Sequence, residues 1–238
     1  MPESHLNAAL DGHRMGQRSS GCTAVDKILG GGIETDCITS IYGPAGAGKT
    51  NLALLAAITT VKAGKKVIYV DTEGGVSVPR LEQLADKDTL QKILFLQPTT
   101  FKEQCAMIAK LSLADVGLIV VDSISMLYRL ELGENFSDTN RELGKQLAAL
   151  TAITRKRQIP ILLTNQVYSA FDERDKVRMV GGDLLQYGSK CIIELQITPN
   201  NLRRAVLRKH RSPPPDVHAL FKITQKGCEE AKERFSLF

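Results

Sequence analysis

The chain has 238 residues, of which 43% are hydrophobic and 24% charged, and its formal net charge is +5. This length accommodates one large domain or two small ones, and no apolar run approaches the roughly 20 residues that a membrane-spanning helix needs. The first twenty residues lack the basic and apolar segments of a signal peptide. Five scattered cysteines without a C-x-x-C pair indicate neither a zinc site nor a disulfide framework, so we expect a cytoplasmic protein with small buried cysteines.

The predicted elements alternate between strands and helices. Residues 1–19 are polar and aperiodic, which predicts a flexible extension before a single domain at 20–238. A strand at 37–43 precedes a helix at 49–61, and continuous apolar strands at 66–71, 92–96, 117–122 and 160–165 are typical of parallel strands covered on both faces. A helix capped by Asp138 is expected at 138–157. Strands at 190–197, 203–209 and 218–224 follow without helices. We therefore predict an α/β fold with a mainly parallel central sheet, helices on both faces and antiparallel C-terminal strands.

A glycine-rich phosphate-binding motif follows the first of these strands. Residues 43–50 have the sequence GPAGAGKT, which satisfies G-x-x-x-x-G-K-[ST] between a strand and a helix. Such glycines let backbone N–H groups converge on phosphate, and the helix N-terminus adds a favourable dipole. We predict that Lys49 bridges the β- and γ-phosphates of ATP and that the Thr50 hydroxyl coordinates Mg²⁺. The predicted loop residues are Gly43, Pro44, Ala45, Gly46, Ala47, Gly48, Lys49 and Thr50.

Two acids and a glutamine lie at the ends of other predicted strands. Asp122 ends strand 117–122, where a carboxylate holds Mg²⁺ through its water shell. Glu73 follows strand 66–71 and can activate water for attack on the γ-phosphate if that strand neighbours the one before the phosphate loop. Gln166 follows strand 160–165 and either senses the γ-phosphate or merely caps the strand. The pattern predicts Glu73, Lys49 and Gln166 as catalytic residues, and it predicts Thr50 and Asp122 as the residues that bind the metal.

Four segments together resemble the RecA-type recombinases, above all the archaeal RadB branch of the RadA/RadB group. They are SSGCTAVDKILGGGIETDCITSIYGPAGAGKT, YVDTEGG with PRLEQL, IVVDSISMLYR, and LLTNQV with GGDLLQYGSKCIIEL, and they extend over nearly the whole chain. The resemblance implies ATP and Mg²⁺, Glu73 as the catalytic glutamate and Gln166 as a switch between nucleotide and DNA. It also implies that Arg80 stacks on adenine. The helical N-terminal DNA-binding domain of RadA recombinases has no room here, which favours the RadB branch.

The same resemblance implies two DNA-binding loops, one after Arg129 and one at residues 168–182. The first, RLELGENFSDTNR, sets three acids against two arginines, which makes a poor surface for phosphates. The second mixes basic and acidic side chains, and its two aromatic residues either stack on bases or pack in the core. We therefore expect weak DNA binding, above all to single strands, rather than full strand exchange. The residues expected to bind DNA are Arg129, Tyr168, Phe171, Arg174, Lys176 and Arg178.

Five positive charges without an acid lie within residues 203–211, while the rest of the chain sums to zero. In RecA-type ATPases, positive side chains of one subunit can reach the γ-phosphate bound by its neighbour. KHRS at 209–212 resembles the K-x-R pair of KaiC-like and bacterial RadA-like proteins, so Lys209 and Arg211 are predicted to share a face and to contact a neighbour's ATP. Arg203, Arg204 and Arg208 are expected to form a positive face for DNA, with a solvated edge strand as the alternative.

The expected function is ATP-dependent DNA repair and homologous recombination. We expect a slow Mg²⁺-dependent ATPase that assists a RadA-type recombinase and binds single-stranded DNA, with ATP at the interface of a homo-oligomer. Three alternatives remain: a DNA-stimulated ATPase that is itself the recombinase, a KaiC-like signalling ATPase that phosphorylates itself without DNA, and a scaffold that binds ATP without turnover. ATP turnover with and without DNA distinguishes them.

Overall fold

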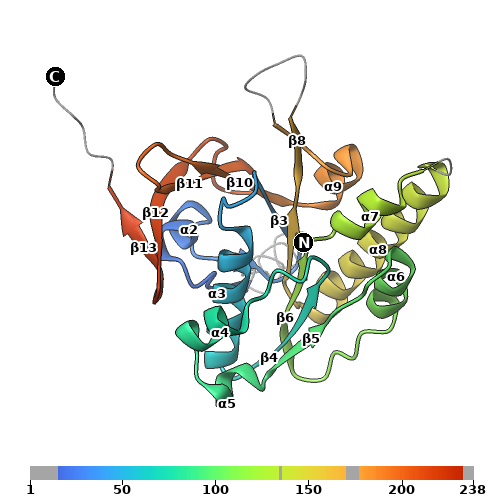
Figure 1. Cartoon of the computed structure of the whole chain (residues 1–238), viewed down its shortest axis with the longest axis horizontal. Coiled ribbons are helices and arrows are strands. Elements are labelled where there is room, and N and C mark those ends of the chain that lie inside the picture. The colour runs from blue at the N-terminus through green and yellow to red at the C-terminus, as the bar shows by residue number, and fades with distance from the viewer. Residues whose placement is uncertain (1–15, 134–135, 170–176, 233–238) are drawn as a thin grey trace, which may run out of the picture.

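A computed structural model describes residues 16–133, 136–169 and 177–232 (Figure 1). Strand β1 (Gln17–Arg18) lies within the predicted extension 1–19 and pairs antiparallel with β2 (Ile33–Glu34). None of the described helices is long and apolar enough to cross a membrane.

The core of the fold is a nine-stranded sheet with the order β13-β12-β11-β10-β3-β7-β6-β4-β5. Its parallel part confirms the apolar runs of the sequence and consists of β3 (Ile38–Tyr42), β7 (Ile161–Asn165), β6 (Val116–Asp122), β4 (Lys66–Asp71), β5 (Ile93–Leu96) and β10 (Cys191–Ile197). Strands β11 (Arg203–Lys209), β12 (His218–Thr224) and β13 (Gly227–Ala231) extend the sheet antiparallel. Strand β10 joins the two parts of the sheet, because it pairs antiparallel with β11, as expected, and also pairs parallel with β3.

Helices cover both faces of this sheet, as predicted (Figure 1). One buried cluster includes side chains of α2 (Thr23–Ile28), α3 (Lys49–Lys62) and α4 (Val78–Leu84), and the short helix α5 (Lys87–Leu90) lies beside α3. The opposite cluster holds side chains of α6 (Phe101–Ala109), α7 (Met126–Glu131), α8 (Phe136–Arg157) and α9 (Gly182–Gly188). The predicted Asp138 cap is wrong, because α8 already includes Phe136 and Asp138 lies in its first turn.

The carboxyl ends of the parallel strands meet at one edge of the sheet, and the phosphate loop follows β3 at this edge. Asp71 of β4 and Asp122 of β6 are directly paired in register, and Asn165 of β7 pairs with Tyr42 of β3. A two-stranded hairpin, β8 (Val167–Ser169) with β9 (Val177–Met179), continues from the end of β7. The predicted catalytic side chains therefore converge here because parallel strands place their carboxyl ends together.

Candidate functional site

The phosphate loop occupies the turn between β3 and α3, with Gly48 as the N-cap of the helix. Gly48 has a φ of 100°, and a Cβ there would lie 2.6 Å from Cδ1 of Ile223 on β12. Only glycine combines this left-handed backbone with so close a contact. The C-terminal strand β12 therefore borders the phosphate loop, a contact that the sequence pattern does not predict.

Lys49 folds back over the loop. Its Nζ donates to the carbonyl oxygens of Gly43 at 2.8 Å and Pro44 at 3.0 Å. Burial lowers the pKa of Lys49, while the negative charges of Glu73 and Asp122 raise it. The structure thus brings the predicted lysine and both predicted carboxylates within electrostatic reach of one another.

Asp122 ends β6 and is almost fully buried, with a relative exposure of 3%. Its carboxylate accepts a hydrogen bond from the Tyr69 hydroxyl at 2.7 Å and another from the Thr164 hydroxyl. Burial raises the pKa of Asp122, and hydrogen bonds from Thr164, Tyr69 and Thr50 oppose that shift. A buried carboxylate beside the Thr50 hydroxyl is a hard oxygen donor set, which fits Mg²⁺. Sequence reasoning missed Tyr69, because a tyrosine inside an apolar strand gives no signal of its partner.

Glu73 lies just beyond the end of β4. Its predicted role assumed that this strand neighbours the strand before the phosphate loop, and that assumption is wrong. Strand β4 does not neighbour β3, because β7 and β6 lie between them. The Glu73 carboxylate nevertheless reaches across, and its Oε1 accepts a hydrogen bond of 2.9 Å from Nε2 of Gln166. The loop after β4, rather than the strand order, brings Glu73 to this site.

Gln166 lies at the centre of a continuous set of contacts. Its Oε1 accepts a hydrogen bond of 3.4 Å from Nη1 of Arg129 on α7, and its backbone N–H donates to Oγ of Ser125 at 3.3 Å. The side chains Glu73, Gln166 and Arg129 form a chain that we call the relay. It joins the carboxylate near Lys49 to the residue from which the first predicted DNA loop begins.

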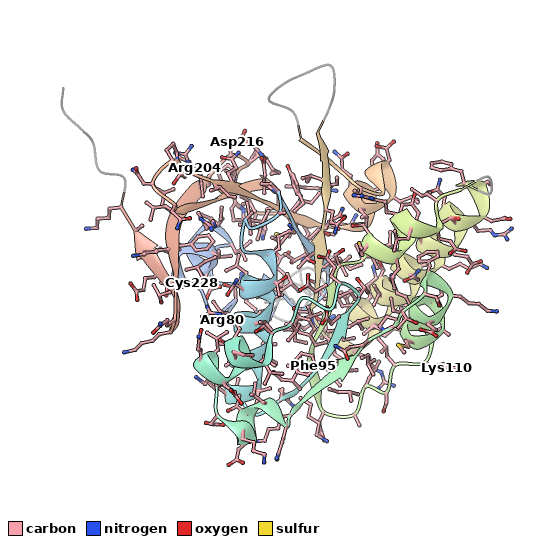
Figure 2. All side chains as sticks on the ribbon, in the orientation of Figure 1. Arg80, Phe95, Lys110, Arg204, Asp216 and Cys228 are labelled. Carbon is pink, nitrogen blue, oxygen red and sulfur yellow. The ribbon has the colours of Figure 1, made fainter. Side chains whose placement is uncertain are left out.

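Arg80 on α4 connects the start of α3 to the β12–β13 turn (Figure 2). Its Nε donates to Oδ1 of Asn51 at 2.9 Å, and its Nη1 donates to the backbone oxygen of Gln225 at 3.1 Å. Arg80, which is expected to contact adenine, thus lies beside the first turn of α3, the helix that follows the phosphate loop.

The predicted joint projection of Lys209 and Arg211 is wrong. The register of β10 against β11 shifts so that Leu207 lies opposite Ile193 but Lys209 lies opposite Ile192. Lys209 then donates from Nζ to the backbone oxygen of Gln186 at 2.7 Å. The irregularity changes which face the last residue of the strand occupies.

Arg211 turns instead toward two carboxylates of its own chain. Its Nη2 donates to Glu34 at 2.7 Å and its Nη1 donates to Asp36 at 2.8 Å. The side chain of Glu34 is 2% exposed, so its negative charge requires a partner of this kind. Glu34, Asp36 and Cys37 offer ligand atoms within 4.8 Å of one another, but the guanidinium already binds both carboxylates.

The other arginines of the basic run do not form one positive face. Arg203 and Arg204 are adjacent in β11 and therefore point to opposite faces of the sheet. Arg203 donates to the backbone oxygen of Asn201 at 2.9 Å, whereas Arg208 pairs with Glu194 at 2.7 Å and with Asp216. The expectation that these arginines share one face for DNA is therefore wrong, because they point to opposite faces of the sheet and Arg208 is paired with acids.

The second predicted DNA loop is described only at its base. Tyr168 of β8 pairs with Arg178 of β9 in the backbone register, so these two positions lie opposite each other. Phe171, Arg174 and Lys176 lie outside the described residues.

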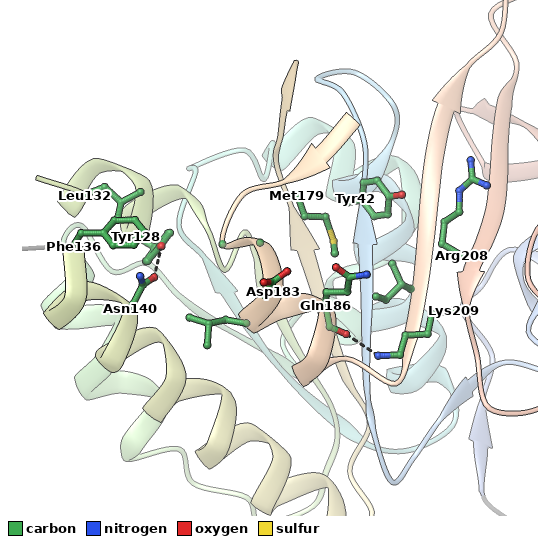
Figure 3. Close-up of a pocket in the computed structure, with 14 residues that line it drawn as sticks. Tyr42, Tyr128, Leu132, Phe136, Asn140, Met179, Asp183, Gln186, Arg208 and Lys209 are labelled. Atoms are coloured by element: carbon green, nitrogen blue, oxygen red, sulfur yellow. Dashed lines mark hydrogen bonds between the residues drawn. The ribbon is translucent and has the colours of Figure 1, made fainter. Parts of the chain in front are cut away.

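A groove of about 1020 Å³ is lined in part by Tyr128, which directly precedes Arg129 of the relay in α7 (Figure 3). Leu132 and Phe136 line it where the first predicted DNA loop lies, Met179 lines it at the end of the second, and Lys209 lines its far end. The Tyr128 hydroxyl donates to Oδ1 of Asn140 at 2.6 Å within the groove. Sequence reasoning missed this groove because its lining comes from several elements that are far apart in the sequence.

Comparisons with known proteins agree on one family. The family profile described as Rad51 matches residues 13–231. The DNA repair and recombination protein RadB of Methanobrevibacter smithii is 41% identical over 91% of this chain and 96% of the relative, and the RadB of Methanoculleus marisnigri is 44% identical over 88% and 96%. A crystal structure of the RadB recombinase, 40% identical, superposes with a TM-score of 0.78 over 90% of this chain and 99% of that one.

Proposed function

From the premise that this chain belongs to the Rad51 family of RecA-like proteins and to its RadB-type DNA repair and recombination members, we propose a nucleotide-controlled DNA-binding function. In this proposal the domain from residue 20 onward binds ATP and Mg²⁺, hydrolyses ATP slowly and binds single-stranded DNA. It acts beside a RadA-type recombinase rather than driving strand exchange itself. The observation that carries the proposal is the relay of Glu73, Gln166 and Arg129, which joins the phosphate site to the DNA loops.

The side chains around the phosphate loop support the hydrolytic part of this proposal. Lys49 exchanges its two loop carbonyls for phosphate oxygens, and the loop N–H groups and the α3 terminus hold the phosphates. Mg²⁺, held beside Thr50 and Asp122, supplies charge neutralisation for the phosphates. Glu73 accepts a proton from the attacking water. Glu73 also accepts a hydrogen bond from the Gln166 amide, so the attacking water and Gln166 compete for the same carboxylate. The Glu73 carboxylate thus takes part both in hydrolysis and in the relay.

The relay supports the switching part. When the γ-phosphate accepts a hydrogen bond from the Gln166 amide, that amide no longer donates to Glu73. The contact between Gln166 and Arg129 then shifts as well. Arg129 is exposed on α7, at the start of the first DNA loop, and the backbone after Gln166 enters hairpin β8–β9. Nucleotide binding therefore biases both loops through one side chain, which is the type of local contact that can couple two sites.

ATP turnover with and without single-stranded DNA tests the proposed activity. We expect a slow Mg²⁺-dependent rate that Lys49→Ala and Glu73→Gln abolish and that DNA changes by less than about tenfold, or 1.4 kcal/mol of barrier. Stimulation beyond tenfold would instead indicate a recombinase in its own right. ATP binding without turnover in the unmodified chain would leave only the scaffold, and a phosphorylated serine or threonine without DNA binding would indicate the signalling ATPase.

A further inference from the structure

Glu73 occupies an exposed loop that has little packing of its own. The loop continues through Gly74 and Gly75, and a Cβ built on either glycine would meet no atom within 4 Å. The side chain of Glu73 is itself exposed, and its carboxylate accepts the hydrogen bond from Gln166. A long exposed side chain keeps its carboxylate in one place only if the backbone beneath it is held. The residues on either side of Glu73 therefore decide where this carboxylate lies.

Thr72, the residue before Glu73, is bound to the end of the strand that carries Asp122. Strands β4 and β6 run side by side (Figure 1), and the backbone N–H of Thr72 donates to the carbonyl oxygen of Asp122 at 2.8 Å. The Thr72 hydroxyl donates to the carbonyl oxygen of Ser123 at 2.8 Å and accepts a hydrogen bond from the Ser123 N–H at 2.9 Å. Thr72 is buried, so water does not compete for these bonds. Three hydrogen bonds thus fix the backbone before Glu73 to Asp122 and its neighbour.

Asp71, the last residue of β4, holds the loop on the other side of Glu73. Its buried carboxylate accepts hydrogen bonds from the backbone N–H groups of Gly75 at 3.2 Å and Val76 at 3.4 Å. A buried carboxylate is costly unless it is hydrogen-bonded, and both of these donors belong to the loop. The side chain of Val76 also packs against the buried cluster around α3. The far end of the loop is therefore bound to the same strand end from which Glu73 departs.

Continuation of the sheet explains only one of these contacts. A strand ladder needs backbone N–H and C=O groups alone, so the bond from the Thr72 N–H would form with any side chain at this position. The bonds of the Thr72 hydroxyl and of the Asp71 carboxylate are additional, and they begin where strand β4 ends. Their place on both sides of Glu73 indicates that they serve this loop rather than the sheet.

We propose that Asp71 and Thr72 are positioning residues, together called the clamp, that fix the Glu73 carboxylate relative to Asp122. The clamp acts through Glu73 and does not itself touch the nucleotide. Proton transfer from the attacking water requires a base within hydrogen-bond reach, so a small displacement of Glu73 slows hydrolysis. Nucleotide binding depends on the phosphate loop and is retained. The effect on hydrolysis rests on the proposed function, whereas the fixed position of the loop does not.

Single-turnover ATP hydrolysis by the full chain tests the clamp. Thr72→Val removes the hydroxyl but keeps the shape, so we expect hydrolysis to slow by about tenfold or more while the affinity for a fluorescent ATP analogue changes by less than about twofold. Thr72→Ser retains the hydroxyl and is expected to restore the rate. Thr154→Val is the matched control, because Thr154 is also buried and donates to the backbone oxygen of Thr151 at 2.9 Å in α8. An unchanged rate in Thr72→Val, an equal loss in Thr154→Val, or no recovery in Thr72→Ser would overturn the proposal.

Amide hydrogen exchange of the nucleotide-free chain separates a failure of the clamp from a failure of the proposed function. We expect the amides of residues 73–76 to exchange about threefold faster or more in Thr72→Val and in Asp71→Asn, while those of α8 keep their rates. Unchanged exchange at 73–76 in both variants would overturn the clamp, and faster exchange throughout α8 would show a general loss of stability and overturn its local role. An unmodified chain that binds ATP without hydrolysing it would overturn the proposed hydrolysis, and the exchange rates then decide the clamp alone.

Discussion

At the scale of single residues, the buried carboxylate of Asp122 lowers the stability of the folded chain in its charged form. Burial raises its pKa, and three hydroxyl groups oppose the shift by donating hydrogen bonds to it. Its charged form is therefore disfavoured in the folded chain. A carboxylate kept in such a place indicates a ligand that compensates for the cost of burial, and a divalent cation is such a ligand.

Asp122→Asn is predicted to stabilise the nucleotide-free protein at neutral pH by about 1 kcal/mol and to abolish Mg²⁺-dependent nucleotide binding. The folded pKa of Asp122 lies above its unfolded value of about 3.9, so the unmodified protein loses stability as pH rises from that value through the folded pKa. The variant lacks this loss. Urea unfolding as a function of pH measures it, and Asp115→Asn, an exposed substitution just before β6, is the control. Equal pH profiles for Asp122→Asn and the unmodified chain would contradict the assignment.

Arg211 is predicted to matter for folding rather than for a neighbour's ATP. Arg211→Ala removes the guanidinium from the buried carboxylate of Glu34 and leaves it the weak Cys37 thiol donor, so we expect a loss of about 2 kcal/mol or more in unfolding free energy. Arg211→Ala combined with Glu34→Gln recovers part of this loss because the unpaired charge is gone. Lys209→Ala, which removes only a contact to a backbone oxygen, serves as the control. Chemical denaturation measures all four proteins, and equal effects of Arg211→Ala and Lys209→Ala would refute this role.

At the scale of elements, the parallel core of the fold is predictable because continuous apolar strands must be covered on both faces. The phosphate loop is predictable as well, because its spacing and its place between strand and helix are fixed by phosphate geometry. The strand order is not predictable, since apolar runs such as 66–71 and 160–165 contain no information about which strands they pair with. The shift in register beside Lys209 cannot be predicted from the sequence either, because a one-residue irregularity leaves the pattern of apolar residues almost unchanged.

The contact between the β12–β13 hairpin and the phosphate loop gives an element-scale prediction. Gly48→Ala places a methyl group against Ile223 and also strains a left-handed backbone, so we expect a loss of about 1–3 kcal/mol. Gly46→Ala is the matched control, because Gly46 has a φ of 74° but no atom within 4 Å of its Cβ position. Adding Ile223→Val, which removes the clashing Cδ1, is expected to rescue the first variant and not the second. Thermal unfolding of the double variants decides this, and equal rescue of both would show that the hairpin does not contact the loop.

At the scale of the whole molecule, the proposed function makes the relay a switch between two ligands. The proposed nucleotide site lies at the carboxyl ends of β3, β4 and β6, and the proposed DNA-binding surface lies beyond α7 and the β8–β9 hairpin. Gln166 contacts both sides, through Glu73 and through Arg129. By thermodynamic reciprocity, a nucleotide that changes the affinity for DNA must have its own affinity changed by DNA to the same extent.

The affinity for a single-stranded oligonucleotide, measured by fluorescence anisotropy with and without a non-hydrolysable ATP analogue, tests this coupling most directly. We predict that the analogue changes the affinity of the unmodified protein by about fivefold or more and that Gln166→Ala removes this difference. Gln91→Ala, which alters an exposed glutamine remote from the relay, is predicted to retain it. An affinity for DNA that is the same with and without the analogue, or a full nucleotide effect in Gln166→Ala, would contradict the relay.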